Sequence, residues 1–576
     1  MKIAFAALTQ GYYRNIESVV ERLAEGGHDI YLGHEKPDSA IGGQAIIERL
    51  AGRFPNIRHG RIPEREPEFS FLASKLRLGI DYLRYLHPMY TKASWLRTRA
   101  EVRTPLGVVR LMRAPLVASR VSRWLVGRYL DAIDRAIPPS PAIERFLDEQ
   151  KPDLLVVTPL MALGGASQLD VLRSAQARGI PTVLIVWSWD HLSSKAVIRD
   201  ETDGVFVWND AQRDVAIRMH GLPASRVVVT GAQCFDKWFG RSPARTRPDF
   251  LRRVGLPADR PYILWVCSAL LQGGPREPRL VMEWATHLRN SADPRLRDVP
   301  ILIRPHPSRL DEWEGVDWRS IGHVALFGDN PIEEEARDDY FDTLYHSAAV
   351  VGITTSAFIE AAIVDRPVMT IFLDDVRHEH EGSLHFQLLL NFSGGLMTTA
   401  STLEEHARQL ASMIESPPRE VVERQRRFVR AFVRPHGLDV PATDVAVEKL
   451  EEIGRAPSRV APRRSTAIGR SGLRALAALE RDPRWHRWFL AEREAARDAW
   501  IVEKRRLRDR VLGRTSREEK DKRRDEKERL RKSALPKSGR GLRSPRPPSP
   551  CPAPTPIRAA SGNCVRRQRC SASGVP

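Results

Sequence analysis

The sequence has few features of a secreted, membrane-spanning or metal-stabilised protein. Its 576 residues include only five cysteines, none with the paired spacing of a zinc site or a disulfide framework. No stretch approaches the roughly 18 apolar residues of a membrane span. The about six apolar residues before Thr9 are too few for a secretory signal. We therefore expect a cytoplasmic protein, and these features are also compatible with peripheral binding at the inner membrane face.

Most of the chain also lacks an excess of either charge. Residues 1–450 hold 57 Lys and Arg against 57 Asp and Glu, whereas residues 451–576 hold 34 against 15 and carry the whole net charge of +19. Within this tail, residues 489–533 are typical of a charged helix without an apolar stripe, and the Pro- and Ser-rich remainder is typical of disorder. The tail is either solvated or a surface for acidic lipid or nucleic acid, but the neutral body makes nucleic acid an unexpected partner.

Apolar runs of strand length alternate with helical patterns along the body of the chain. Residues 2–8 read as a strand, 16–27 as a helix that ends at Gly26-Gly27, and 28–33 as a second strand. The same rhythm returns from residue 151, with near-continuously apolar strands of five to six residues. Such strands are buried on both faces, which predicts an α/β fold built on doubly wound parallel sheets.

A helix-rich stretch interrupts this rhythm between residues 66 and 136. It holds 13 basic and 6 acidic residues, with arginines between aliphatic and aromatic residues. One interpretation is an inserted helical subdomain with solvated arginines. The other is a surface for a lipid-linked or anionic acceptor, because basic amphipathic helices favour membrane interfaces.

The body divides into two α/β domains of similar size. We expect one domain over 1–235, a second over 236–415, and crossing helices over 416–454 before the tail from 455. A small-residue loop follows the strand that starts the second domain, from Ser268 to Gly274.

A glycine, three hydroxyl residues and an acid follow one strand of the second domain, in VVGITTSAFIEAAIVDRPVMTI. Gly352 permits close approach of a backbone. Thr354, Thr355 and Ser356 stand where a helix begins and can cap it or bind phosphoryl oxygens. Glu360, on the first turns, suits a ribose diol. The alternative is an ordinary capped turn with Glu360 on the surface.

Another strand of the second domain ends in the sequence RPHP. Arg304 supplies a permanent cation with bidentate geometry for a diphosphate. His306, between two prolines, can donate to phosphate or to a leaving oxygen. Together with Ser268 and the loop after it, these residues lie at strand ends, where open α/β sheets bind ligands.

With these motifs the chain resembles the GT-B glycosyltransferase superfamily, over residues 1 to about 435. Non-hydrolysing UDP-N-acetylglucosamine 2-epimerases share that layout, and RPHP is similar to a His-Pro motif of CDP-glycerol glycerophosphotransferases and polysialyltransferases. The resemblance implies a nucleotide-sugar donor on the second domain: Arg304 and His306 at the phosphates, Thr354, Thr355 and Ser356 at the helix start, and Glu360 at the ribose. It implies no cofactor and no catalytic metal, and no Asp-x-Asp motif accompanies these residues.

The resemblance places a glycan or lipid-linked acceptor, and any general base, on the first domain. Asp190 is the preferred base and His191 the second candidate, with a helix cap and an exposed histidine as the plain alternative. Gln10, Gly11 and Arg14 are expected to line the acceptor cleft. The glycine-histidine signature of some lipid-acceptor relatives is absent there.

Two clusters remain outside this scheme. Acids and histidines between Asp374 and His385 suit a polar loop near the donor sugar, solvated charge or, least of all, a metal site. Gly231 and Asp236 suit a hinge between the domains. The leading hypothesis is sugar transfer to a hydroxyl acceptor in surface polysaccharide or glycolipid assembly. Glycerol-phosphate transfer, epimerisation, and a non-catalytic nucleotide-sugar-binding or scaffold protein are the alternatives.

Overall fold

The computed structural model describes residues 1–484 apart from a few short segments. These segments are 38–41, 92–96, 98–99, 102, 118, 161–166, 195–196, 269–275, 374–383 and 463. The expectations for the loop after Ser268, for the acids and histidines of 374–381, and for the tail beyond 484 therefore lie outside the described residues.

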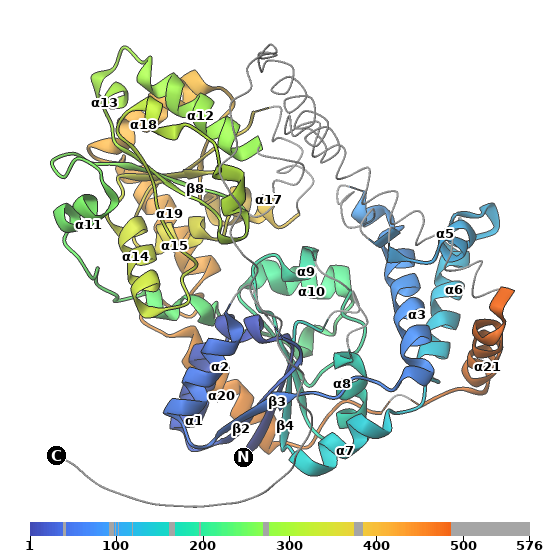
Figure 1. Ribbon diagram of the computed structural model, residues 1–576. Coiled ribbons are helices and arrows are strands. Elements are labelled where there is room, and N and C mark those ends of the chain that lie inside the picture. The colour runs from blue at the N-terminus through green and yellow to red at the C-terminus, as the bar shows by residue number, and fades with distance from the viewer. Residues whose placement is uncertain are drawn as a thin grey trace, which may run out of the picture. The chain divides into compact units, whose positions relative to one another are not determined.

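Seven parallel strands form the first sheet, in the order β3-β2-β1-β4-β5-β6-β7 (Figure 1). They are β1 (Lys2–Thr9), β2 (Asp29–Lys36), β3 (Ile57–Arg61), β4 (Leu154–Thr158), β5 (Thr182–Ile185), β6 (Gly204–Val207) and β7 (Val227–Val229). In the register, Ile3 of β1 pairs with Ile30 of β2 and with Leu154 of β4. The strand order reverses between β1 and β4.

Successive residues of a strand point to opposite faces of the sheet, and in the first sheet the residues on both faces are apolar. Helices therefore cover both faces. One core joins Phe5 and Val156 to α1 (Glu17–Glu25), α2 (Gly43–Arg53) and α20 (Ala442–Arg455). The other core joins Ala6 and Val157 to the helices of the opposite face. Those helices are α7 (Pro141–Gln150), α8 (Gln168–Ala177) and α10 (Asp210–His220).

The stretch between β3 and α7 is helical, as the sequence predicts. Its elements are α3 (Pro67–Tyr85), η2 (Pro88–Tyr90), α5 (Leu106–Arg113), η3 (Pro115–Val117) and α6 (Arg120–Asp134). Helix α21 (Ala467–Arg481) packs closely on α6, and a Cβ at Gly469 would lie 2.2 Å from the carbonyl oxygen of Ala132. Among the described residues, no helix has the length and apolarity needed to cross a bilayer.

Six parallel strands form the second sheet, in the order β10-β9-β8-β11-β12-β13. They are β8 (Ile263–Val266), β9 (Ile301–Arg304), β10 (Val324–Leu326), β11 (Ala349–Gly352), β12 (Val368–Ile371) and β13 (Thr398–Ala400). This order repeats that of the first sheet and reverses between β8 and β11. Both sheets are thus doubly wound, which confirms the predicted fold class.

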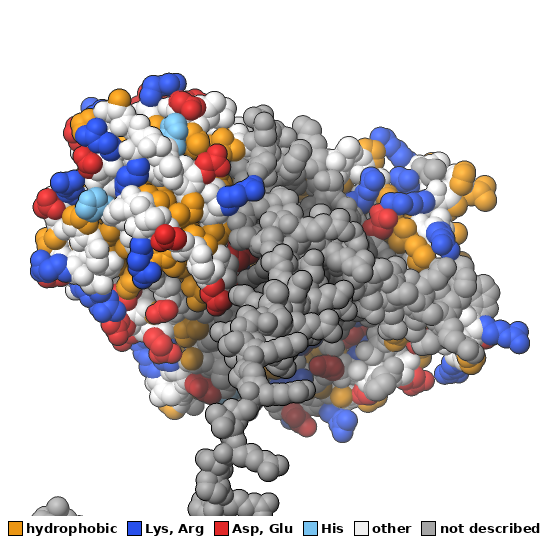
Figure 2. Space-filling view, turned by 45° about the horizontal axis from the view of Figure 1, so that its top comes forward, with side chains coloured by type: hydrophobic (Ala, Val, Ile, Leu, Met, Phe, Trp, Pro, Cys, Tyr) orange, Lys and Arg blue, Asp and Glu red, His pale blue; other side chains and the backbone are white. Residues whose placement is uncertain are grey.

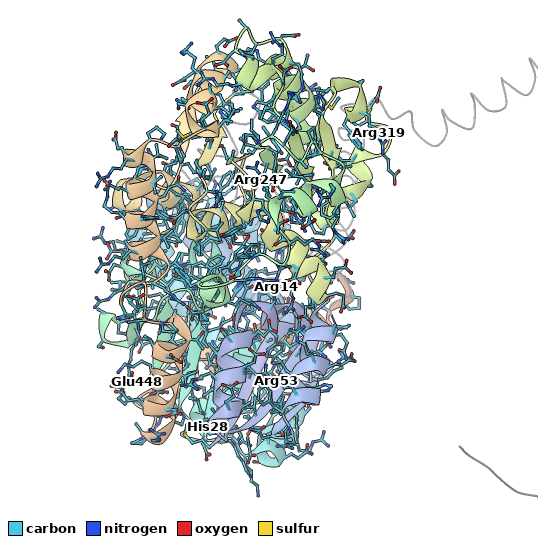
Figure 3. All side chains as sticks on the ribbon, turned by 90° about the vertical axis from the view of Figure 1, so that its left-hand side faces the viewer. Arg14, His28, Arg53, Arg247, Arg319 and Glu448 are labelled. Carbon is cyan, nitrogen blue, oxygen red and sulfur yellow. The ribbon has the colours of Figure 1, made fainter. Side chains whose placement is uncertain are left out.

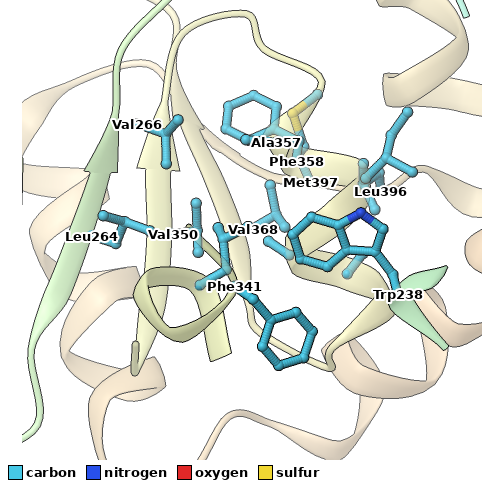
Figure 4. Packing of buried hydrophobic residues seen from close by; sticks show 14 of the residues in the cluster. Trp238, Leu264, Val266, Phe341, Val350, Ala357, Phe358, Val368, Leu396 and Met397 are labelled. Atoms are coloured by element: carbon cyan, nitrogen blue, oxygen red, sulfur yellow. The ribbon is translucent and has the colours of Figure 1, made fainter. Parts of the chain in front are cut away.

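The second sheet is also buried on both faces. Leu264 and Val350 face a core that includes Trp238 and Phe358 (Figure 4), whereas Trp265 and its alternate neighbours face the opposite core. The first face is covered by α11 (Arg247–Val254), α14 (Glu334–Tyr345), α15 (Ala357–Ile363), α17 (Phe386–Asn391) and α19 (Arg419–Phe432). The second face is covered by α12 (Arg276–Arg289), α13 (Pro294–Arg297) and α18 (Leu403–Ile414).

The chain returns from the second sheet to the first after α19. Asp236, in η5 (Gln233–Trp238), accepts from Arg434 Nε at 2.9 Å and from the backbone N–H of Thr443 at 2.6 Å. Beyond this junction, Leu450 and Ile453 of α20 join the core of the first sheet. Asp236 therefore holds the start of α20 against the segment that joins the two sheets.

Most strands are shorter than the five to six residues that the sequence predicts. Strand β5 spans only Thr182–Ile185, although the apolar run continues through buried Val186. The Val186 N–H still donates to the carbonyl oxygen of Phe206 in β6 at 2.9 Å, so the apolar run includes a residue at the strand end that lies outside the assigned strand. Strands β3 and β13 were not predicted, because these edge strands carry polar residues in place of an apolar run.

Candidate active site

The carboxyl ends of β8 and β11 meet where the order of the second sheet reverses. The Ser268 hydroxyl donates to the carbonyl oxygen of Thr354 at 2.7 Å. Gly352 permits the close approach of the two strands, because a Cβ there would lie 2.7 Å from the carbonyl oxygen of Val266. Cys267 N–H donates to the carbonyl oxygen of Arg304 at 3.0 Å, so the end of β9 lies alongside. The structure thus brings three of the predicted loops to one edge.

The three hydroxyl residues before α15 differ in their contacts. Thr355 Oγ1 accepts from the Ala357 N–H at 3.3 Å. Ser356 holds the N-cap position with an exposed side chain that makes no capping bond. The Thr354 hydroxyl is buried and finds no hydrogen-bond partner among the described residues. Of the three hydroxyls, only that of Thr355 caps the helix.

Arg304 and Glu360 are joined through Tyr340, a residue of α14. The Arg304 guanidinium lies 4.6 Å from the centre of the Tyr340 ring, and the Tyr340 hydroxyl donates to Glu360 Oε2. Arg304 also donates to the carbonyl oxygen of Asp329 at 2.7 Å and is only 4% exposed. The protein therefore holds the Arg304 cation below the edge of the sheet, where it supports Tyr340 and Glu360.

Glu360 is buried, in contrast to the surface position that was its plain alternative. Burial raises the pKa of this carboxyl, while the Tyr340 hydroxyl and the charges of Arg14 and Arg304 oppose the rise. Burial also raises the pKa of Tyr340 well above its ordinary value, so the phenol remains a donor. A buried acceptor held by a phenol and two cations is pre-organised for a hydroxyl or diol.

His306 is a half-buried histidine directly after β9. Burial and the positive charges of Arg309 and Arg14 lower its pKa to about 4, so the ring is neutral at pH 7. Its Nδ1 accepts from the Ser308 N–H at 3.2 Å. A neutral imidazole with Nδ1 as acceptor carries its proton on Nε2. His306 therefore presents an uncharged N–H donor.

Arg14 brings a cation from the first domain to these groups. It lies in η1 (Gln10–Asn15), directly after β1, and Figure 3 places it beside elements of the second sheet's domain. Its charge acts on the pKa values of His306, Tyr340 and Glu360. Over the described ranges it is half-buried and forms no ion pair or hydrogen bond with another side chain. Its guanidinium is thus available to an anion.

More cations than anions gather next to Arg14. Glu17 is bonded by Arg49, by Lys237 Nζ at 2.7 Å, and by Arg337 at 3.8 Å. Burial opposes ionisation of Glu17, but the three cations outweigh it and lower its pKa. Arg337 belongs to α14 of the second sheet, so this cluster joins the two domains and leaves a local positive potential.

The two candidate bases of the first domain differ in accessibility. His191 is 1% exposed, and its Nε2 donates to the carbonyl oxygen of Pro159 at 2.7 Å. Asp190 is half-buried, accepts from the Ser188 hydroxyl, and immediately precedes the short helix α9 (His191–Ser194). Nearby, Trp189 contacts His385 of the second domain edge to face, with ring centres 4.8 Å apart. Asp190 is therefore the more accessible of the two.

Gln10 and Gly11 face the interior of the first domain. Gln10 is 4% exposed, with its amide nitrogen next to Gln44 and 3.3 Å from His34 Nε2. A Cβ at Gly43 would lie 2.3 Å from the backbone N of Gly11, so the start of α2 packs on this turn. Of the three residues expected in the acceptor cleft, Arg14 alone reaches toward the second domain.

Several site residues escaped the sequence reasoning. Tyr340, Arg337 and Glu277 lie on helices and belong to no motif. Glu277 accepts from the Ser268 N–H at 2.8 Å and from Trp265 Nε1 at 3.3 Å, which fixes the end of β8. Their contacts in the folded chain reveal them: Tyr340 with Glu360, Arg337 with Glu17, and Glu277 with Ser268. Among the described residues no group of three or more His, Cys, Asp or Glu is placed to hold a metal ion.

Two doubly wound parallel sheets in one chain, joined by a returning C-terminal helix, define the GT-B class of fold. Solved structures similar to this chain include a glycosyltransferase from Rickettsia africae (10% identity, TM-score 0.46, 79% of this chain and 98% of that chain). They also include a UDP-N-acetylglucosamine 2-epimerase from Neisseria meningitidis bound to UDP-N-acetylglucosamine (12%, 0.44, 78% and 100%). A third is the calicheamicin glycosyltransferase CalG4 (12%, 0.40, 79% and 98%).

The likeness concerns the fold alone at these identities, and the fold assignment itself rests on the strand orders of the two sheets. No protein-family model matches this chain, and the search of curated protein sequences found no match.

Proposed function

We propose that this protein is a glycosyltransferase that moves a sugar from a nucleotide-sugar donor to a hydroxyl acceptor. The donor would bind at the carboxyl edge of the second sheet, and the first domain would hold a glycan or lipid-linked acceptor. Surface polysaccharide or glycolipid assembly is the setting that such acceptors suggest.

The observation that carries this proposal is the convergence of Arg14 on Glu360 and His306. A cation from the first domain acts electrostatically on both a buried carboxyl and a neutral histidine of the second. A nucleotide diphosphate combines a ribose diol, which suits Glu360, with an anion, which suits Arg14 and the Nε2–H of His306. Arg304 packs on the Tyr340 ring, and the Tyr340 hydroxyl donates to Glu360, so these two residues hold the Glu360 carboxyl in place.

In the transfer step the acceptor oxygen forms a bond to the anomeric carbon while the bond from that carbon to the phosphate oxygen breaks. The nucleotide diphosphate leaves with the electron pair of the broken bond. Arg14, His306 and the excess of positive charge around Glu17 would stabilise the negative charge that develops on it. These groups supply the stabilisation without any metal ion in the proposed step.

Asp190 is the proposed general base that takes the proton of the acceptor hydroxyl. It is the half-buried carboxylate beside the contact of Trp189 with His385, where the two domains meet. His191 is proposed as a positioning residue, since its Nε2–H is engaged with Pro159 and fixes the start of α9. General bases of this kind contribute about a hundredfold to ten-thousandfold in rate.

The test is release of nucleotide diphosphate from UDP-, GDP-, CDP-, dTDP- and ADP-sugars, with and without a panel of glycan and lipid-linked acceptors. We expect release from one donor class that depends on an added acceptor and falls about a hundredfold or more in Asp190→Asn. Asp210→Asn, an exposed acid on α10, is the matched control and should leave release unchanged.

Three other outcomes of this experiment would each indicate a different function. A product epimer formed from the donor alone indicates epimerisation. Release of CMP from CDP-glycerol indicates glycerol-phosphate transfer. Tight donor binding without turnover for any acceptor, unchanged in Asp190→Asn, indicates a non-catalytic binding protein.

A further inference from the structure

Helix α6 has an exposed face that is apolar. Val121 and Trp124 are 68% and 63% exposed, and Leu125 and Tyr129 also face solvent. Their successive spacings of three, one and four residues place them along one side of a helix. The opposite side, with Ile133 and Leu130, is already buried against α3 and α21. An exposed helix face is normally polar, so this arrangement is the reverse of a solvated surface helix.

The short η3 helix and α5 extend the apolar surface. Leu116 in η3 is 88% exposed, and Leu111 in α5 also lies open to solvent. By contrast, Val109 and Met112 of the same helix are buried in a separate small core. We define the α5–α6 patch as Leu111, Leu116, Val121, Trp124, Leu125 and Tyr129.

Basic side chains outnumber acids around the α5–α6 patch, where Arg113 is paired with Glu101 at 2.5 Å. From Arg103 to Leu130 the chain has six arginines and no Asp, Glu or Lys. Arg110, Arg120 and Arg128 are exposed, and the Arg128 guanidinium lies 5.8 Å from the centre of the Trp124 ring. Figure 2 shows hydrophobic and basic side chains side by side over the part of the molecule that carries α5 and α6. The body of the chain is neutral, so this charge is a local feature.

Apolar side chains framed by arginines match the interface of an anionic bilayer. Leucine and valine reach the acyl boundary, tryptophan and tyrosine favour the headgroup level, and arginine pairs with anionic headgroups. We propose that the α5–α6 patch binds the surface of an anionic lipid membrane, with Leu116, Trp124 and their neighbours inserted at the headgroup level. This patch would hold the protein at the membrane as a peripheral protein, whichever reaction its active site performs.

The test is co-sedimentation of the full chain with vesicles of phosphatidylcholine alone, or with phosphatidylglycerol as about a third of the lipid. We expect binding to the anionic vesicles and little to the neutral ones. The double variant Leu116→Ser and Trp124→Ser should weaken the partition about tenfold or more. Arg120→Gln with Arg128→Gln should weaken it by a similar factor at low salt and by less at high salt.

Two matched variants control for surface apolarity and for charge. Leu438→Ser removes an exposed leucine between α19 and α20, and Arg419→Gln removes an exposed arginine of α19. Both retain the α5–α6 patch and the basic tail, and both should bind the anionic vesicles as the unmodified chain does. Far-ultraviolet circular dichroism and thermal melting identify any variant that fails to fold.

The proposal is overturned if the folded patch variants bind anionic vesicles as tightly as the unmodified chain, since the tail alone would then supply the attraction. Equal binding to neutral and anionic vesicles would also overturn it. So would a change in oligomeric state in the patch variants without a change in vesicle binding, since the patch would then be covered by a second copy of the chain.

Discussion

At the scale of single residues, burial sets the protonation of the candidate site. It lowers the pKa of His306 to about 4, with help from Arg309 and Arg14, and raises the pKa of Glu360. The first shift makes His306 a neutral donor at pH 7. The raised pKa of Glu360 makes its ionisation depend on the neighbouring groups, because a buried carboxyl ionises only where cations and hydrogen-bond donors face it.

The effect of burial on a carboxyl pKa can be tested at Glu277 by measuring the free energy of unfolding. Burial raises its pKa from 4.5 to about 8, against its hydrogen bonds with Ser268 and Trp265. Between those two values the folded protein binds more protons than the unfolded chain, so the free energy of unfolding falls as pH rises. In Glu277→Gln this contribution disappears. Relative to the unmodified protein, the variant should gain up to about 1.4 kcal/mol per pH unit over that window.

Urea unfolding at about pH 6 and about pH 8 measures this gain. Glu283→Gln, an exposed acid on the same helix, is the control and should track the unmodified protein at both values. Glu35 has the same burial and a pKa of about 8, so it leaves part of the pH dependence in every variant. An identical pH dependence in Glu277→Gln and the unmodified protein would show that Glu277 is ionised in the folded state.

At the scale of elements, a buried ion network fastens the helical insertion to the first sheet. Arg77 of α3 donates to Asp134 of α6 at 3.0 Å and to Asp170 of α8 at 3.1 Å. Arg173 of α8 donates to Asp134 at 2.6 Å. Arg77, Asp134 and Asp170 are almost wholly buried, so each charge depends on its partners.

Arg77→Met should therefore cost about 3–5 kcal/mol of the free energy of unfolding, because two buried carboxylates lose a shared cation. The urea midpoint measures the loss. Arg61→Met, which removes an exposed arginine paired with Glu64 at 3.3 Å, should cost less than about 1 kcal/mol. Similar losses in the two variants would mean that the network contributes no more than a surface pair.

The sequence predicted the central strands, but it missed the elements and residues that only contacts in the folded chain define. Strands such as β4 and β11 are apolar at every position because both of their faces are covered, and the sequence shows this directly. Edge strand β3 has polar residues, and nothing local distinguishes it from a loop. Tyr340 could not be found in the same way, because its bond to Glu360 joins two helices that no motif connects.

At the scale of the whole molecule, the chain crosses between its two sheets twice. The outward crossing runs through η5, and the return runs from α19 to α20. Asp236 bonds both crossings through Arg434 and Thr443, while Glu17 bonds Lys237 of the first crossing and Arg337 of the second domain. These contacts bring Arg14 of the first domain to Glu360 and His306. The order of elements was readable from the sequence, but this meeting of side chains was not.

The central claim is that both domains contact one nucleotide diphosphate. Isothermal titration of the full chain with UDP, GDP, CDP, dTDP and ADP measures this directly, with Arg14→Met in the first domain, Glu360→Gln in the second, and Arg53→Met, an exposed arginine of α2, as control. We expect one nucleotide to bind, and each of the two site variants to weaken it about tenfold to a hundredfold, while Arg53→Met does not. Binding that is unchanged in Arg14→Met, or no binding of any nucleoside diphosphate, would contradict the account.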